Sequence, residues 1–126
     1  NAERIWSCAR GIKGLRVPFC PDDITHAAYK CYVFVEPDKL KDDWSRDRIL
    51  TEINALGVPC FSGSCSEVYL EKAFEGTGWR PDKRFPVAKE LGETSLMFLV
   101  HPTLMEIEID KTCDAISTVM AQACPT

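Results

Sequence analysis

The chain has 126 residues, of which 45% are hydrophobic and 27% charged, and its formal net charge is −4 at pH 7. A single globular domain of this size can bury roughly two-thirds of the surface that its unfolded chain exposes. The acidic balance argues against a nucleic-acid or anionic-membrane surface, because phosphate groups require a concentrated positive field. The longest purely apolar run, Leu96 to Val100, is too short to span a bilayer.

Seven cysteines are scattered along the sequence without a Cys-x-x-Cys pair. A disulfide framework favours an even number of cysteines in a short secreted chain, and no signal-peptide pattern opens this sequence. We therefore expect free thiols and a reducing, cytoplasmic location. Cys60 and Cys65, together with His101, leave open the alternative of a thiol or metal enzyme, although a zinc site needs four ligands.

The first residues, Asn1-Ala2, are interpreted as the remnant of a cleaved expression tag, so that residues 3–126 form a single α+β domain. Apolar residues at helical spacing from Ile5 to Ile12 predict the first helix, which Gly14 can end. Residues 15–17 then favour a short strand.

A longer strand is predicted over residues 29–35, which alternate between two sides and are rich in aromatic and β-branched residues. One side of this strand carries Tyr29, Cys31, Val33 and Val35.

The next helix is marked at both ends. Ser45 suits the N-cap position, and Trp44 before it can pack against Ile49. Gly57 supplies the residue that follows the C-cap. Residues 58–61 are expected to form a short edge strand, because the proline within them cannot donate a backbone hydrogen bond to a ladder.

The second half of the chain alternates turns, helices and one buried strand. A turn over residues 62–66 leads into a helix expected from about Glu67 to Phe74, and residues 75–84 form a surface loop. Pro86 begins another short helix, and Leu96 to Val100 predict a buried central strand.

The last helix is predicted to start with a capping box formed by Thr103 and Glu106. Its apolar face carries Ile109, Cys113, Ile116 and Met120. The expected fold is α+β, with a small, mostly antiparallel sheet of three to four strands packed by helices.

No complete catalytic motif is present, so no catalytic, cofactor-binding or metal-binding residue is assigned to this chain. The turn over residues 62–66 precedes a predicted helix and offers hydroxyl and backbone N–H groups. Ser62 and Ser64 are therefore candidates for contact with a phosphate or sugar hydroxyl, the alternative being a simple capping turn. His101, at the end of the buried strand, is a further candidate for substrate contact, or a histidine that donates to a carbonyl at a turn. Lys30 is interpreted as a solvent-side strand residue rather than a Schiff-base lysine.

Three blocks follow one another along the chain. Residues 26–35 are a strand entered through a His-Ala pair, and residues 46–58 are an arginine-led helix that ends in glycine. Residues 86–104 are a short helix, a buried strand and a His-Pro turn. This succession, which runs from about Gly14 to the end of the chain, resembles the C-terminal part of the DegT/DnrJ/EryC1/StrS family of pyridoxal-phosphate (PLP) sugar aminotransferases.

The resemblance implies that the chain is the C-terminal small domain of a larger cytoplasmic, homodimeric enzyme. Such enzymes transfer an amino group, commonly from glutamate, to a keto group of a nucleotide-linked sugar, in cell-surface polysaccharide or related amino-sugar biosynthesis. The family places the Schiff-base lysine and the aspartate that faces the pyridine nitrogen in the N-terminal large domain. PLP is then bound mainly by that missing domain and not by this chain, which lines one side of the substrate cleft and is inactive alone.

In one place the chain differs from the family pattern. Most members have a Pro-Leu-His turn after the short strand, where this chain has Gly63-Ser64-Cys65. A minority of the family replaces the lysine by histidine and dehydrates sugars, so a sugar dehydratase is one alternative. A stand-alone α+β protein-interaction module with an exposed apolar surface is another.

Overall fold

The structure is a computed structural model that describes residues 1–126. Its α-helices are α1 (Ala2–Ala9), α2 (Arg46–Ala55), α3 (Pro86–Thr94) and α4 (Glu106–Ala123). Its strands are β1 (Leu15–Arg16), β2 (Cys31–Val35), β3 (Cys60–Phe61) and β4 (Ser95–Phe98). Short 3-10 helices are η1 (Pro37–Lys39), η2 (Val68–Leu70) and η3 (Lys72–Phe74). The strands form one antiparallel sheet in the order β1-β2-β4-β3, which confirms the predicted α+β class and the central and edge positions of β4 and β3.

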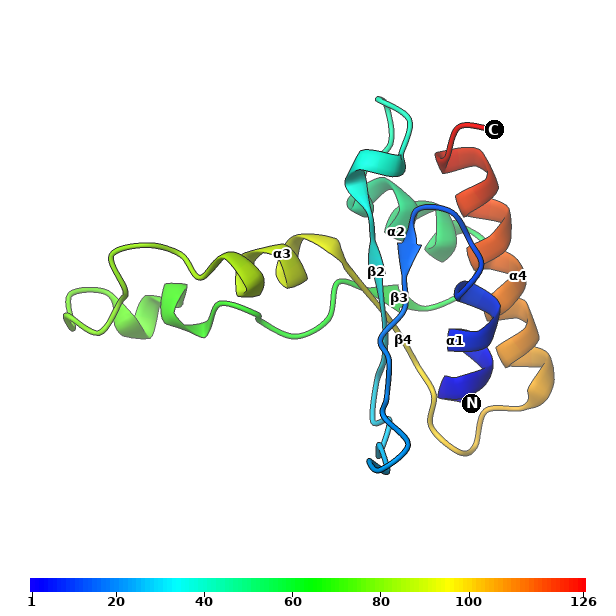
Figure 1. Cartoon of the computed structure of the whole chain (residues 1–126), viewed down its shortest axis with the longest axis horizontal. Coiled ribbons are helices and arrows are strands. Elements are labelled where there is room, and N and C mark those ends of the chain that lie inside the picture. The colour runs from blue at the N-terminus through cyan, green and yellow to red at the C-terminus, as the bar shows by residue number, and fades with distance from the viewer.

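One face of the sheet is covered by α1, α2 and α4 (Figure 1). Side chains alternate along a strand, so Val33 of β2 and Phe98 of β4 point to this face, where they are 0% and 1% exposed. They pack in one apolar core with Ile49 and Ile53 of α2 and Ile116 of α4. The apolar residues with helical spacing and those that alternate along the strands therefore pack in a single core, as the sequence predicts.

The ends of α2 form as expected. The Ser45 hydroxyl accepts a hydrogen bond from the backbone N–H of Arg48 at 3.2 Å, which satisfies one of the free donors of the first turn. Gly57 follows the C-cap with φ +76°, a left-handed conformation that glycine adopts without steric cost.

Residues 62–85, here called the arm, extend away from the sheet on the side opposite α1 and α4 (Figure 1). The predicted helix over residues 67–74 is wrong, because only the two short 3-10 helices η2 and η3 form there. Residues 75–84 are a loop, as predicted.

Hydrogen bonds among Glu67, Tyr69, Arg84 and Phe85, here called the clasp, connect the two ends of the arm. The buried Glu67 carboxylate accepts hydrogen bonds from the Arg84 guanidinium, with an Nε–Oε1 distance of 2.8 Å, and from the Tyr69 hydroxyl at 2.6 Å. The same hydroxyl accepts from the backbone N–H of Phe85 at 2.9 Å, and the two rings meet edge to face. The hydrogen bonds from Arg84 and Tyr69 lower the pKa of Glu67 to about 2. The clasp therefore gives the arm a defined shape although it packs little against the body.

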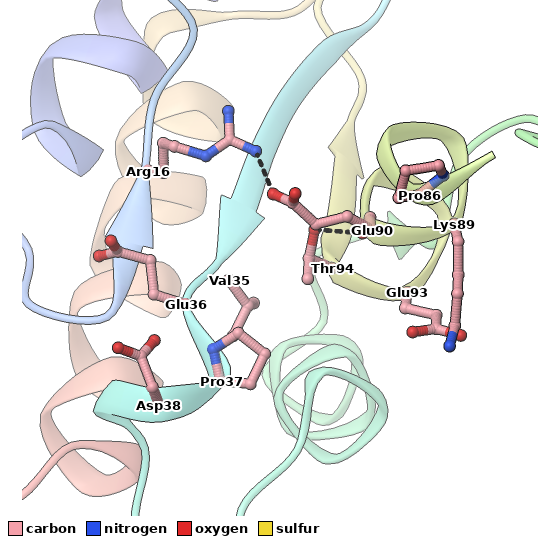
Figure 2. Close-up of a pocket in the computed structure, with 10 residues that line it drawn as sticks. All are labelled: Arg16, Val35, Glu36, Pro37, Asp38, Pro86, Lys89, Glu90, Glu93 and Thr94. Atoms are coloured by element: carbon pink, nitrogen blue, oxygen red, sulfur yellow. Dashed lines mark hydrogen bonds and ion pairs between the residues drawn. The ribbon is translucent and has the colours of Figure 1, made fainter.

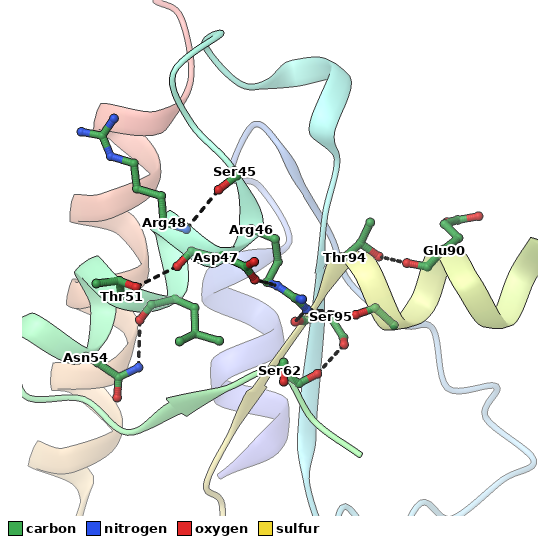
Figure 3. Close-up of polar contacts among 12 residues, drawn as sticks. Ser45, Arg46, Asp47, Arg48, Thr51, Asn54, Ser62, Glu90, Thr94 and Ser95 are labelled. Carbon is green, nitrogen blue, oxygen red and sulfur yellow. Dashed lines mark hydrogen bonds and ion pairs between the residues drawn. The ribbon is translucent and has the colours of Figure 1, made fainter. Parts of the chain in front are cut away.

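Arg46 connects α2 to the start of the central strand (Figure 3). Its Nη1 atom donates to the carbonyl oxygens of Gly92 at 3.1 Å and Ser95 at 2.9 Å, and its side chain is only 15% exposed. The Ser95 hydroxyl in turn donates to the Ser62 carbonyl at 2.6 Å. This chain of bonds fixes α3, β4 and the beginning of the arm relative to one another.

The structure corrects the predicted N-terminus of the last helix. The expected capping box of Thr103 and Glu106 is wrong, because α4 begins at Glu106 with Met105 as its N-cap, and Glu108 accepts from the Met105 backbone N–H at 2.8 Å. The Thr103 hydroxyl instead lies 2.7 Å from Nδ1 of His101. The carboxylate three residues after the actual N-cap thus satisfies the free donor.

One further position, in the predicted long strand, differs from the sequence analysis. Tyr29 was placed on the buried side of its strand, but β2 begins at Cys31 and Tyr29 is 86% exposed. Ala2 is buried in α1, and the Asn1 side chain donates to the carbonyl of His101 at 3.0 Å. None of the helices combines the length and hydrophobicity needed to cross a bilayer.

Candidate functional site

The face of the sheet opposite the core carries a row of half-exposed aromatic side chains. Tyr32 and Phe34 project to this face because they alternate with the buried residues of β2, and their rings stack with centroids 6.3 Å apart. The Arg16 guanidinium lies over the Phe34 ring, 4.6 Å from its centroid. Lys30 lies next to Tyr32 on the same face, on the side of Tyr32 away from Phe34.

The turn at the start of the arm closes onto this row and forms a group of three residues, here called the hydroxyl cluster: Lys30, Tyr32 and Ser64. The Lys30 ammonium donates to the Ser64 hydroxyl at 3.0 Å, and the Tyr32 hydroxyl accepts from the Ser64 backbone N–H at 3.1 Å. Gly63, with φ +96°, permits this approach, because a Cβ atom there would lie 2.5 Å from the Tyr32 ring.

The hydroxyl cluster changes the acidity of the phenol. Burial raises the pKa of Tyr32, but hydrogen bonds from Ser64 and the positive charge of Lys30 outweigh it and leave the pKa below its ordinary value. The Tyr32 hydroxyl is therefore suited to donate a hydrogen bond to an acceptor or to an anionic group.

Beside the hydroxyl cluster lies an apolar cleft of about 390 Å³ between β2 and the loop of residues 17–30. β1 pairs only with Phe34 and Val35 of β2, and beyond this pairing the indole N–H of Trp6 donates to the Tyr32 carbonyl at 3.0 Å. No carboxylate lines this cleft, and Lys30 is the only lysine or arginine among its lining residues. Its apolar walls are Trp6, Pro18, Phe19, Pro21, Ile24 and Phe34.

The structure does not bring the three predicted substrate-contact residues together. Ser64 belongs to the hydroxyl cluster, and the Ser62 carbonyl is bound by Ser95 at the start of β4. His101 follows the other end of β4 and is exposed. Because β3 and β4 are antiparallel, residues that follow β3 lie beside the beginning of β4 and away from its end.

Sequence reasoning missed two members of the hydroxyl cluster. Lys30 was interpreted as a solvent-side residue, whereas it is half-buried and bound to Ser64, and Tyr32 was not considered. The period-two pattern of β2 was sufficient to place both residues on one face. Their contact with a turn more than thirty positions away had no signal in the sequence.

A second hollow, of about 550 Å³, lies between the end of β2 and α3 (Figure 2). An ion pair between Arg16 and Glu90, with an Nη2–Oε1 distance of 3.3 Å, reaches across it. This polar hollow has an excess of negative charge, since Arg16 and Lys89 face four carboxylates, those of Glu36, Asp38, Glu90 and Glu93. The electrostatic field of the polar hollow disfavours the binding of anions, although this hollow has a larger volume than the apolar cleft.

The alternative of a thiol or metal enzyme is not supported by the positions of the possible ligand residues. No group of three or more histidine, cysteine, aspartate or glutamate side chains is placed to hold a metal ion. All seven cysteines are free, and burial raises the pKa of the Cys60 thiol to about 12, which disfavours the reactive thiolate.

The chain is similar to solved aminotransferase structures. An aminotransferase from Psychrobacter cryohalolentis is 57% identical in sequence and superposes with a TM-score of 0.88, over 96% of this chain and 33% of that chain. The aminotransferase TlmJ from Streptoalloteichus hindustanus is 20% identical, with a TM-score of 0.78 over 96% of this chain and 30% of its own. A DegT DnrJ EryC1 StrS aminotransferase from Brucella abortus is 22% identical, with a TM-score of 0.70 over 91% of this chain and 28% of its own.

No family model and no curated protein matches the chain. The chain spans about a third or less of each solved structure that it resembles. The two distant similarities show a shared fold, and the 57% identity shows that the chain corresponds to a fragment of an aminotransferase.

Proposed function

We propose that the chain is the small domain of a PLP-dependent aminotransferase that acts on a nucleotide-linked keto sugar in cell-surface polysaccharide or related amino-sugar biosynthesis. The observation that carries this proposal is the 57% identity over 96% of the chain, to one third of an aminotransferase. The whole enzyme is then a cytoplasmic homodimer with an amino donor such as glutamate. The isolated chain lines the substrate cleft and does not catalyse amino transfer.

Within this proposal, the open face of the sheet is the side that meets the substrate. It presents the hydroxyl cluster, which offers an ammonium group and two hydroxyls at one place. Hydroxyl and ammonium groups are suited to the oxygen-rich surface of a sugar or a phosphate. Of the residues that the sequence suggested for substrate contact, Ser64 is the one whose hydroxyl lies beside both an ammonium group and a phenol hydroxyl.

We propose that the PLP site lies in the part of the enzyme that this chain does not include. PLP supplies the amino-group chemistry through a Schiff base with lysine, and an acidic partner faces its pyridine nitrogen. Lys30 lies beside an apolar cleft, but no carboxylate lines that cleft. We therefore place the cofactor in the remaining two thirds of the enzyme and assign no step through it to this chain.

The test is a chimera in which this chain replaces the corresponding third of the Psychrobacter cryohalolentis aminotransferase. We expect the chimera to consume glutamate together with a nucleotide-linked keto sugar, and the isolated chain to do neither. A folded chimera that fails where the parent enzyme succeeds would contradict the proposal. So would a borohydride-trapped PLP adduct on a single lysine of the isolated chain, located by mass spectrometry.

The choice between aminotransferase and dehydratase needs a different measurement. The coding DNA upstream of this segment is to be sequenced, since the residue that distinguishes the two reactions lies in the large domain. We expect an open frame that encodes a lysine at the cofactor position. A histidine there would replace the aminotransferase with a dehydratase, and a start codon directly upstream of this segment would favour a stand-alone interaction module.

A further inference from the structure

We propose that the arm is the element by which this chain docks onto the large domain of the enzyme, with Trp79 near its tip as the anchoring side chain. This inference rests on the proposed function, because the partner is the part of the aminotransferase that the chain does not include. It gives residues 62–85 a role as a protein-binding surface, separate from the open face of the sheet.

The arm exposes apolar side chains instead of burying them in its own domain. None of its residues belongs to the apolar core, and Glu67 of the clasp is its only buried residue. Trp79 is 76% exposed, and Val68, Leu70 and Phe85 are exposed as well. Tryptophan is among the residues most enriched at the energetic centres of protein interfaces. A segment that extends from the domain and carries such side chains is therefore suited to a protein partner (Figure 1).

Hydrogen bonds within the arm hold Trp79 in place before a partner binds. Nη2 of Arg80 donates to the carbonyl oxygens of Leu70 at 2.7 Å and Glu71 at 3.0 Å, which connects the two limbs of the arm. The backbone N–H of Trp79 donates to the Thr77 hydroxyl at 3.2 Å. Since the clasp holds the other end, docking needs little further ordering of the arm, and less of the binding free energy is lost to conformational entropy.

The charges of the arm are compatible with burial in an interface. Its acidic side chains are Glu67, Glu71, Glu75 and Asp82, and they are balanced by the basic side chains Lys72, Arg80, Lys83 and Arg84. The net charge of the arm is therefore zero, whereas the whole chain carries −4. Arg84 pairs with Glu67, and Arg80 lies 3.6 Å from the carboxylate of Glu75. Ion pairs that enter an interface with both partners leave no uncompensated charge there.

The large domain is the occupant that the length of the related enzyme favours. This chain matches 33% of the aminotransferase from Psychrobacter cryohalolentis, so the greater part of such an enzyme is available to cover the arm. The helices α1 and α4 of this chain lie on the other side of the sheet and do not cover it (Figure 1). The small domain of a second copy is the competing occupant.

The first experiment is a photo-cross-link in the chimera with the Psychrobacter cryohalolentis aminotransferase. Trp79→p-benzoylphenylalanine places a reactive ketone near the tip of the arm, and mass spectrometry after irradiation identifies the peptide that it captures. We expect a peptide of the large domain, of the same subunit or of the partner subunit. Capture of a peptide from another small domain, or no cross-link, would overturn the inference.

The second experiment compares amide exchange in the isolated 126-residue chain and in the chimera. We expect the amides of residues 75–80 to exchange at least about tenfold more slowly in the chimera, because docking protects them. Trp79→Ala should remove most of this difference without changing the melting temperature of the isolated chain, since the side chain is exposed there. Lys83→Ala, which removes an exposed side chain of the same arm, is the matched control and should keep the difference. Equal exchange of residues 75–80 in the two proteins would also overturn the inference.

The proposed function has a separate readout, which is amino transfer by the chimera. An active chimera in which residue 79 captures no large-domain peptide would remove the docking role and leave the aminotransferase. A folded but inactive chimera in which residue 79 captures such a peptide would leave the docking role and remove the proposed activity.

Discussion

Replacement of Arg46 by alanine is the most informative perturbation of this fold, because one side chain connects three elements. The guanidinium extends from the first turn of α2 to the carbonyls of Gly92 in α3 and Ser95 in β4 (Figure 3). Ser95 then holds the Ser62 carbonyl at the start of the arm. Arg46→Ala therefore removes the donor on which α3, β4 and the turn containing Ser64 depend for their relative position.

The structure gives the size of the effect. A hydrogen bond from a charged donor contributes about 1.5–3 kcal/mol, and Arg46 makes two such bonds to backbone carbonyls with a side chain that is 15% exposed. Since both bonds share one nitrogen atom, we expect a loss of about 2–4 kcal/mol in the free energy of unfolding. At about 4 °C per kcal/mol for a domain of this size, the melting temperature should fall by roughly 8–16 °C.

The assay is urea and thermal unfolding of the wild type, Arg46→Ala and a control, Asp47→Ala. The Asp47 carboxylate accepts from Nε of the same guanidinium at 2.7 Å but is 84% exposed, so its loss should cost less than about 0.5 kcal/mol. Amide exchange of α3 and β4 should accelerate in Arg46→Ala, whereas that of α4 should follow only the global stability. The reasoning is refuted if the two variants are equally stable, or if α3 keeps its relative protection.

Three further predictions concern the turn, the arm and the core. Gly63→Ala should destabilise the fold by about 1–3 kcal/mol in chemical denaturation, because the residue has φ +96° and its Cβ would overlap the Tyr32 ring; an equally stable variant would contradict this contact. The pKa of Glu67 is lowered to about 2, chiefly by Arg84, so the clasp should be fully formed above about pH 4.5 and lost as the pH falls through about 2. NMR signals of the arm should follow that transition, and Glu67→Gln should abolish it. Ile53→Ala, at a fully buried position, should cost about 2–5 kcal/mol in urea unfolding, and a cost below about 1 kcal/mol would mean that α2 does not pack in the core as described.

The elements that local chemistry marks could be predicted from the sequence. Ser45 and Gly57 delimit α2, Pro86 begins α3, and the alternation in residues 31–35 defines β2. These signals are local, because a cap, a proline or a period of two acts within a few residues.

The sequence predictions were wrong where a residue of a local pattern makes a contact with a different partner in the fold. Thr103 has the spacing of a capping box, but its hydroxyl is next to His101, and the helix begins three residues later. Residues 67–74 lack a helical apolar stripe that packs on the body, and Glu67 is engaged by Arg84, seventeen positions away. Tertiary contacts of this kind override a weak local preference.

What the sequence by itself determined is therefore the set of elements, their apolar faces and the character of the domain, because these depend on residue spacing. Only the tertiary structure decided which polar residues meet. The antiparallel pairing of β3 with β4 places Ser64 near Lys30 and Tyr32 and leaves His101 at the far end of the same strand. Strand order and register arise from the packing of the whole core, and no spacing within one segment encodes the distance between two residues on different strands.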